Sequence, residues 1–317
     1  MLEQKVKEIM TKEDMKREKM TIDEHFIPCT YLSEFSSKRN DEDSRKSPIF
    51  YYNCEKRISS VFNDVLIKSL SCVKEKYLYE LLMDNENEVL YPNIIEKLLG
   101  KTETDYHKYV QKLDMKICVD NYKTRCFLNH DEKEFWRRWM FHWFFRRPSV
   151  FKDLESYVPK DEDDVYGIGL GGYLSGLCEL GFDDQFITTF FDTKWPQIWG
   201  LNSFCIFYDE YANIITSDNP MCYECENGKI NFILLPISNK FLLIMWSDKR
   251  GHFNVLRPMT TDVREYTFKI IVMHAIKMIF LSQPIDKYHK KIANDILNLR
   301  DKSLKDKSYI RDLITML

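Results

Sequence analysis

The chain has 317 residues, of which 44% are hydrophobic and 14% aromatic, and its formal net charge is -3. So large an apolar fraction excludes an intrinsically disordered chain. The small negative charge argues against capture of nucleic acid over a broad basic surface, although a local basic groove is compatible with this average.

The amino-terminal part of the chain is expected to be helical apart from two extended stretches. Residues 1–22 are charged and are expected to form a tail or a solvated helix. Pro48–Tyr52 has the composition of a β-strand, and His25–Phe35 is expected to join or pack on a sheet. Three further segments have apolar residues at helical spacing: Ile58–Glu80, Asn93–Leu99 and Asp105–Leu113.

The strongest helix signal lies between Asp131 and Pro148. Asp131 and Glu134 form a capping box at its start. Pro148 ends it, because proline lacks an N–H and disfavours helical backbone in the residue before it. The aromatic residues inside this segment fall at helical spacing, which indicates a core stripe and not a surface for stacking nucleic-acid bases.

The second half of the chain changes from glycine-rich to strand-forming. Gly167–Gly181 contains a Gly-x-Gly-x-x-Gly spacing, but an acidic loop precedes it where a nucleotide site needs a strand. A lid or a small-residue packing site is the expected role. Four antiparallel strands are predicted after Gly200: Asn202–Tyr208, Ala212–Thr216, Lys229–Leu235 and Phe241–Trp246. A long apolar helix at Thr260–Leu281 and two shorter charged helices follow.

This order of elements predicts an α+β fold with a mostly helical body and a small antiparallel sheet of about four to six strands. We expect one domain over residues 23–317. Its helical part would cover about residues 58–199 and its strand cluster about residues 202–247.

The nine cysteines predict an intracellular, cytoplasmic protein. Their number is odd and most lie in apolar runs, which indicates reduced thiols. Residues 1–19 lack the apolar region of a secretory signal, and the longest apolar stretches are too short for a bilayer, so no membrane partner is expected. Cys222 and Cys225 form a Cys-x-x-Cys, but no second pair of ligands completes a zinc site, so we interpret the spacing as incidental.

Several short motifs occur in a characteristic order. The first is His25-Phe26-Ile27-Pro28, followed by Tyr31-Leu32 and Phe35-Ser36. A short β-run, a helix ending in Arg146-Arg147-Pro148, Thr216-Ser217-Asp218-Asn219-Pro220 and Leu234-Leu235-Pro236-Ile237-Ser238 follow. In this order the chain resembles the bacterial family catalogued as domain of unknown function 4238, from about Asp23 to Ser282. The resemblance implies candidate site residues but no settled reaction.

Asp218 and Asn219 are the first candidate site residues, with Ser217 beside them. They follow an apolar strand, and strand ends can present side chains to a ligand on a rigid base. Proline after Asn219 restricts the orientation of its amide. The alternative is a structural turn, in which the Asp and Asn side chains bind the backbone and Pro220 fixes the bend.

His25 is the natural partner of Asp218, because the ordinary pKa of histidine lies nearest to neutrality. Such a pair suits general acid or base catalysis, or a metal held with help from Glu24 or Glu34. The alternative is a histidine that bonds backbone carbonyls. The ligand spacing does not indicate a metal, and the cofactor stays open, a divalent metal ion included.

Arg146 and Arg147 are candidate substrate-binding residues. Their guanidinium groups suit phosphate or carboxylate, whereas a structural role at a helix carboxyl end is equally compatible with two cations. Two hypotheses for the function follow. The first is a nuclease-like or phosphate-ester hydrolase, a bacterial toxin or defence effector, acting on nucleic acid or another phosphate-bearing substrate. The second is a non-catalytic binding or sensor module whose polar motifs are structural turns.

Overall fold

The computed structural model describes residues 23–25, 27–59, 64–70, 74–76, 81–83, 88–90, 94–120, 127–146, 201–226, 229–247 and 253–305. The chain divides into two compact units, each built from separate stretches of sequence. Unit 1 comprises residues 1–28, 73–105 and 130–199, and unit 2 comprises residues 29–72, 106–129 and 200–317. The single domain expected over residues 23–317 stays a prediction.

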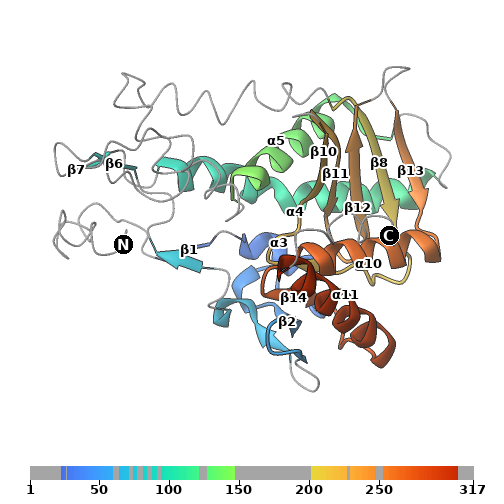
Figure 1. The fold of residues 1–317 in the computed structure, drawn as a ribbon. Helices are drawn as coiled ribbons and strands as arrows, with labels where there is room; N and C mark the ends of the chain where they lie inside the picture. Colours follow the sequence, from blue (N-terminus) through green and yellow to red (C-terminus); the bar gives the residue numbers. More distant parts are fainter. Residues whose placement is uncertain are drawn as a thin grey trace. The chain divides into compact units, whose positions relative to one another are not determined.

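Unit 2 contains a first sheet of five strands in the order β10-β11-β12-β8-β13 (Figure 1). Its strands are β8 Ser203–Tyr208, β10 Cys222–Glu226, β11 Lys229–Pro236, β12 Phe241–Trp246 and β13 Asn254–Pro258. The first four pair antiparallel, and β13 joins β8 in parallel. Runs of Ile, Leu and Phe form β8, β11 and β12, and most of their described side chains are buried.

A second five-stranded sheet of unit 2 joins the two ends of the sequence. Its order is β3-β2-β14-β9, with β4 paired to β2. Its strands are β2 Pro48–Asn53, β3 Ile58–Ser59, β4 Val65–Leu66, β9 Thr216–Ser217 and β14 Met278–Leu281. β14 pairs antiparallel with β2 on one side and with β9 on the other.

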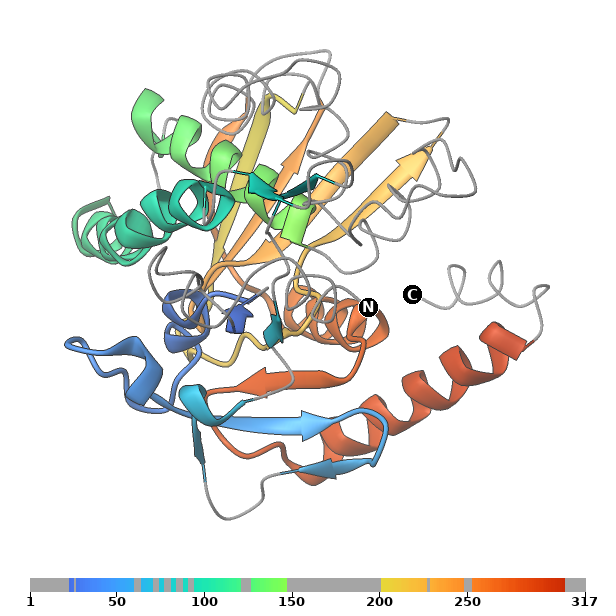
Figure 2. The same cartoon turned by 90° about the vertical axis from the view of Figure 1, so that its left-hand side faces the viewer.

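Helices pack on both sheets of unit 2. They are α3 Cys29–Ser33, the second half of α4 Ile94–Asp120, α10 Thr261–His274 and α11 Lys287–Lys305, with short 3-10 turns η1 Ser44–Lys46 and η2 Ile67–Ser69. Figures 1 and 2 both show α10 between the first sheet and strand β14, with α11 on the far side of α10. The Thr260 hydroxyl accepts from the N–H of Val263 and caps α10.

The described part of unit 1 consists of two short two-stranded sheets and helices. Strand β1 Asp23–His25 pairs with β5 Lys74–Lys76, and β6 Leu81–Met83 pairs with β7 Glu88–Leu90. The first half of α4 and all of α5 His130–Arg146 also belong to it. The described tryptophans of α5, Trp136, Trp139 and Trp143, are buried, as the aromatic spacing predicts.

The prediction of a mostly helical body with one small sheet is wrong. The described residues form two five-stranded sheets and two further two-stranded sheets beside the helices, a mixed α+β fold. Three segments differ from the prediction. Ile58–Glu80, predicted as helix, contains β3, β4, η2 and β5, and His25–Phe35, expected to join or pack on the sheet, contains helix α3. Met278–Leu281, expected in the long helix, forms β14.

None of the helices that the structure describes combines the length and the apolar character that a bilayer crossing needs.

Candidate functional site

Asp218 is a buried carboxylate that binds three consecutive backbone amides. Its Oδ1 accepts from the N–H of Ile276 at 2.8 Å, and its Oδ2 accepts from the N–H groups of Lys277 and Met278 at 2.7 and 3.1 Å. The side chain is only 4% exposed. These amides form the turn between α10 and β14, so Asp218 stabilises a turn remote from it in sequence.

Burial raises the pKa of Asp218 to about 6, while the three backbone hydrogen bonds oppose the shift. Because both oxygens already accept hydrogen bonds, this geometry supports the structural interpretation of the motif. The predicted catalytic role of Asp218 stays a prediction.

Ser217 and Asn219 also bind backbone groups. The Ser217 hydroxyl accepts from the N–H of Asn219 at 3.2 Å. Nδ2 of Asn219 donates to the carbonyl of His274 at 3.0 Å, in the last turn of α10. The motif therefore ties β9 to the end of α10.

The two remote motifs of the sequence meet through Tyr31 and Thr216. The Tyr31 hydroxyl lies 2.6 Å from Oγ1 of Thr216 and donates to the carbonyl of Pro236 at 2.9 Å. All three residues are buried. This buried contact links α3 to β9 within unit 2 and does not involve His25 or Asp218, whose pairing stays a prediction.

The structure describes less of the surroundings of the other predicted site residues. His25 forms a backbone pair with Lys74 in β1, and its side chain lies outside the description. Arg146 ends helix α5, as predicted, and its side chain is likewise not described, while Arg147 and the glycine cluster Gly167–Gly181 lie outside the described residues. Cys222 is buried in β10, and Cys225 lies in the same strand.

Unit 2 contains a cavity of about 90 Å³ between α10, the start of α11 and the loop after β8. Its lining mixes apolar and polar side chains. The polar and charged members are Asn213, Arg264, Thr267, Ser282, Gln283, Asp286 and His289. One water needs about 10–15 Å³ of such space, so the cavity has room for several water-sized groups.

Arg264 enters the cavity lining from α10 and forms an ion pair with the fully buried Asp209. Its Nη2 and Nε lie 2.7 and 3.2 Å from the two carboxylate oxygens. The hydrogen bond to Asp209 holds the pKa of Arg264 above its ordinary value. The guanidinium also lies 5.1 Å from the centre of the Tyr211 ring.

Thr267 follows Arg264 on α10 and also lines the cavity. It is 2% exposed, and within the described residues its hydroxyl has no hydrogen-bond partner. A buried hydroxyl without a partner costs about 1–3 kcal/mol, so a ligand atom that reached this oxygen from the cavity would stabilise the protein.

Asp286 and His289 close the cavity at the start of α11. The Asp286 carboxylate accepts from the N–H of His289 at 2.8 Å and lies 2.6 Å from its Nδ1. Burial alone would raise the pKa of Asp286, but the hydrogen bonds from His289 lower it below its ordinary value. The carboxylate caps the helix and also fixes the imidazole, leaving Nε2 for another partner.

The sequence analysis missed these cavity residues. The only local signal is Asp286 before the charged segment Lys287–Lys305, a helix-cap pattern that also places His289 in the first turn. Within the described ranges, no group of three or more His, Cys, Asp or Glu side chains is arranged to hold a metal ion.

Comparison with known families confirms the predicted resemblance. Residues 24–166 match the sequence model of the family described as Protein of unknown function (DUF4238). This range contains Tyr31, Arg146 and Arg147, whereas Thr216–Pro220 lies beyond it. No curated protein and no solved structure matches the chain.

Proposed function

We propose that the protein is a non-catalytic binding or sensor module that takes part of a small uncharged polar ligand into the cavity beside α10. The observation that carries this proposal is the mixed polar and apolar lining of the cavity, which includes Thr267, a residue whose buried hydroxyl has no described partner. A ligand that hydrogen-bonds this hydroxyl removes the cost of leaving it unpaired.

The charges around the cavity support an uncharged ligand. Arg264 is neutralised by Asp209, and Asp286 lies against His289, so each charged side chain has its own partner. The carboxylate of Asp286 would repel a phosphate in the cavity, and the phosphate would not replace another anion there. A neutral ligand keeps both pairs intact and still finds donors and acceptors on the cavity wall.

The test is a melting-temperature screen of the purified full chain against neutral sugars, nucleosides and amides, with inorganic phosphate as the charged comparator. Ligands of the proposed class should raise the melting temperature in proportion to their affinity. Stabilisation by phosphate alone, or by no compound, would overturn the proposal.

Thr267→Val and Thr267→Ser sharpen this test. Valine keeps the shape but removes the hydroxyl, so affinity for the strongest hit should fall about 5- to 10-fold while the apo protein becomes no less stable. Serine keeps the hydroxyl and should keep most of the binding. Equal affinity for Thr267→Val and wild type would show that the hydroxyl does not contact the ligand.

A phosphate-ester hydrolase is a second candidate, favoured by the pair Asp286–His289. A carboxylate 2.6 Å from Nδ1 orients the imidazole so that Nε2 can take a proton from water. His289→Gln should then abolish cleavage of a chromogenic phosphate ester or of RNA, while the protein stays folded. Absence of cleavage by the wild type, or its survival in this variant, would remove the candidate.

The hydrolase expected from the motifs would use other residues. In that hypothesis His25 acts as acid or base with Asp218, and Asn219, Ser217 and either arginine, Arg146 or Arg147, hold the substrate phosphate. His25→Ala is its most direct test, since the variant leaves the hydrogen bonds of Asp218 in place. Unchanged activity would exclude His25 from the chemistry.

A further inference from the structure

The loop that follows β8 presents Tyr211 to solvent. This side chain is 63% exposed, the largest exposed fraction among the large apolar side chains that the structure describes. Single exposed tyrosines are common on protein surfaces and by themselves indicate no partner. Tyr211 differs because the loop that carries it is fixed in one conformation at a cost in stability.

Asp209 organises this loop. It is fully buried, and its carboxylate accepts from the N–H groups of Tyr211 and Asn213 at 3.3 and 3.1 Å. Its carbonyl accepts from the N–H of Ala212 at 3.1 Å, and the Ser282 hydroxyl donates to the carbonyl of Ala212 at 3.1 Å. The backbone on both sides of the tyrosine ring is therefore held by hydrogen bonds.

Two features of the loop oppose stability. Ala212 has a φ of 52°, and left-handed backbone costs a residue with a Cβ atom about 1–2 kcal/mol. The ion pair of Asp209 with Arg264 removes a carboxylate from water, and well-packed apolar residues in place of such a pair are often at least as stable. Stability alone does not explain this loop, whereas a binding surface that needs a fixed aromatic ring does.

The ring of Tyr211 already binds one guanidinium. The central carbon of the Arg264 guanidinium lies 5.1 Å from the ring centre, within the range of a cation–π interaction. Arg264 covers one face, and the large exposed fraction leaves the other face open to a second flat cation. Tyrosine and arginine are also the side chains that most often dominate the binding energy of protein interfaces.

The charge beside the ring is negative. Asp209 and Arg264 cancel each other, which leaves the exposed Glu210 next to the tyrosine. The pKa of Arg264 is raised chiefly by its hydrogen bond to Asp209 and also by the charge of Glu210, so the latter carboxylate lies near the guanidinium. Lys240, whose carbonyl binds the N–H of Asp209, has its ammonium paired with Asp114. The surface therefore suits a positively charged partner.

We propose that Tyr211 anchors a docking surface for an exposed, arginine-containing segment of another protein. The partner's guanidinium stacks on the open face of the ring, opposite Arg264, and its charge pairs with Glu210. Arginine suits this site better than lysine, because its planar group stacks on a ring and is more weakly hydrated. Tyr211 does not line the cavity, so this surface is independent of the proposed function, and its failure leaves the cavity proposal untouched.

Fluorescence anisotropy on the full chain tests this surface at about 0.15 M salt, where weak long-range attraction is screened. The probes are a labelled peptide of alternating glycine and arginine, the same peptide with lysine in place of arginine, and a single-stranded DNA oligonucleotide. The arginine peptide should bind, and the lysine peptide about 3-fold more weakly or less. No binding of the arginine peptide, or equal affinity of both peptides, would overturn the proposal. Oligonucleotide binding that Tyr211→Ala abolishes would also overturn it, because the ring would then stack on bases.

A matched pair of variants tests the ring. Tyr211→Phe keeps the ring and should keep the affinity for the arginine peptide, whereas Tyr211→Ala should lower it about 5- to 20-fold. Glu210→Gln should lower it about 2- to 5-fold. Equal affinity of Tyr211→Ala and the wild type would exclude the stacking, and equal affinity of Glu210→Gln and the wild type would exclude the charge pairing.

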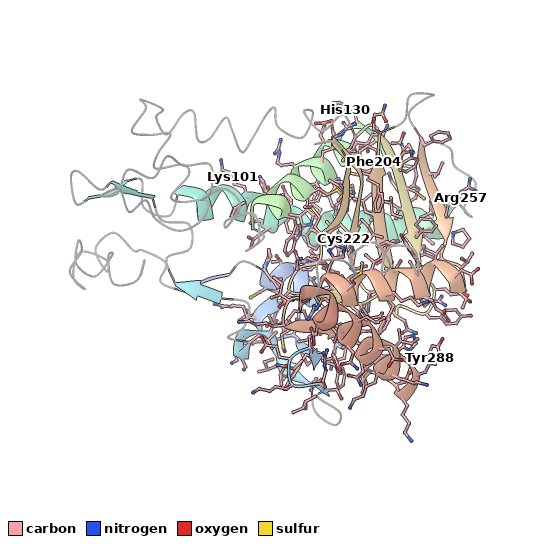
Figure 3. All side chains as sticks on the ribbon, viewed as in Figure 1. Lys101, His130, Phe204, Cys222, Arg257 and Tyr288 are labelled. Atoms are coloured by element: carbon pink, nitrogen blue, oxygen red, sulfur yellow. The ribbon has the colours of Figure 1, made fainter. Side chains whose placement is uncertain are left out.

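Phe253→Ala is the control for a loss of any exposed ring. Phe253 is 49% exposed, and its carbonyl accepts from the N–H of Phe204 at the start of β8, whereas Tyr211 follows the end of this strand. Figure 3 shows Phe204 toward the end of the first sheet that lies away from α10. The control should bind the arginine peptide like the wild type, and an equal loss in Phe253→Ala and Tyr211→Ala would contradict a specific site.

Discussion

Asp218 shows how a single side chain can stabilise a distant turn. Asn at this position keeps the size but turns one hydrogen-bond acceptor into a donor that faces backbone N–H groups. We expect Asp218→Asn to lower the free energy of unfolding by about 2–4 kcal/mol, because buried donors lose their acceptor. Urea denaturation measures it, and Asp301→Asn, at a half-exposed carboxylate, is the control with little expected change.

The pKa of Asp218 also predicts a pH dependence. The folded pKa of about 6 lies above the ordinary unfolded value, so the folded state binds the proton more tightly. This contribution to stability is complete below the unfolded pKa and is lost as the pH rises through 6. Between pH 7.5 and pH 5 the wild type should gain about 1 kcal/mol relative to Asp218→Asn. Parallel pH profiles of the two proteins would contradict this assignment.

The residues around Asp218 and those of the cavity show which contacts sequence patterns leave out. Asp218 and Asn219 stood out because they follow a strand and precede proline, yet their partners at Ile276, Lys277 and His274 carry no local signal. Arg264 and Thr267 lie in an ordinary amphipathic helix. Arg264 matters because it pairs with Asp209, and Thr267 matters because its hydroxyl has no described hydrogen-bond partner. Both facts depend on tertiary packing.

At the scale of elements, the amino-terminal cap of α11 has a measurable role. Asp286→Ala removes the carboxylate that accepts from the N–H of His289, and should lower the free energy of unfolding by about 1 kcal/mol. Asp286→Asn caps almost as well and should keep the stability. Thermal unfolding compares the two variants, and a loss in both would point to the charge and not to the cap.

Elements with explicit end signals were predicted well. Helix α5 begins one residue before the predicted Asp131, which therefore lies in its first turn and does not cap it, and it ends at Arg146, two residues before the predicted stop at Pro148. Phe241–Trp246 forms β12 as predicted, between turn residues and a polar stretch. The prediction of a helix at Ile58–Glu80 was wrong, because the apolar spacing of this segment is also compatible with short strands. Pairing with β2 makes β3 and β4 strands.

At the scale of the whole molecule, unit 2 is assembled from three stretches of sequence. A fragment of residues 200–317 would lack β2, the neighbour of β14, and would lack Tyr31, which binds Thr216 and Pro236. We therefore expect this fragment to remain without a cooperative unfolding transition in circular dichroism. Co-expression with residues 1–199 should restore the transition, and a fragment that folds alone would show that β2 is dispensable.

The pairing of β2 with β14 has a consequence for how the protein is made. The Tyr52 hydroxyl of β2 binds Asn294 of α11, a residue 242 positions later. At the usual pace of ribosomes, strand β2 waits on the order of ten to fifty seconds for β14 and α11 to be synthesised. During that interval its unpaired edge is open to other nascent chains, so chaperone supply should raise the soluble yield.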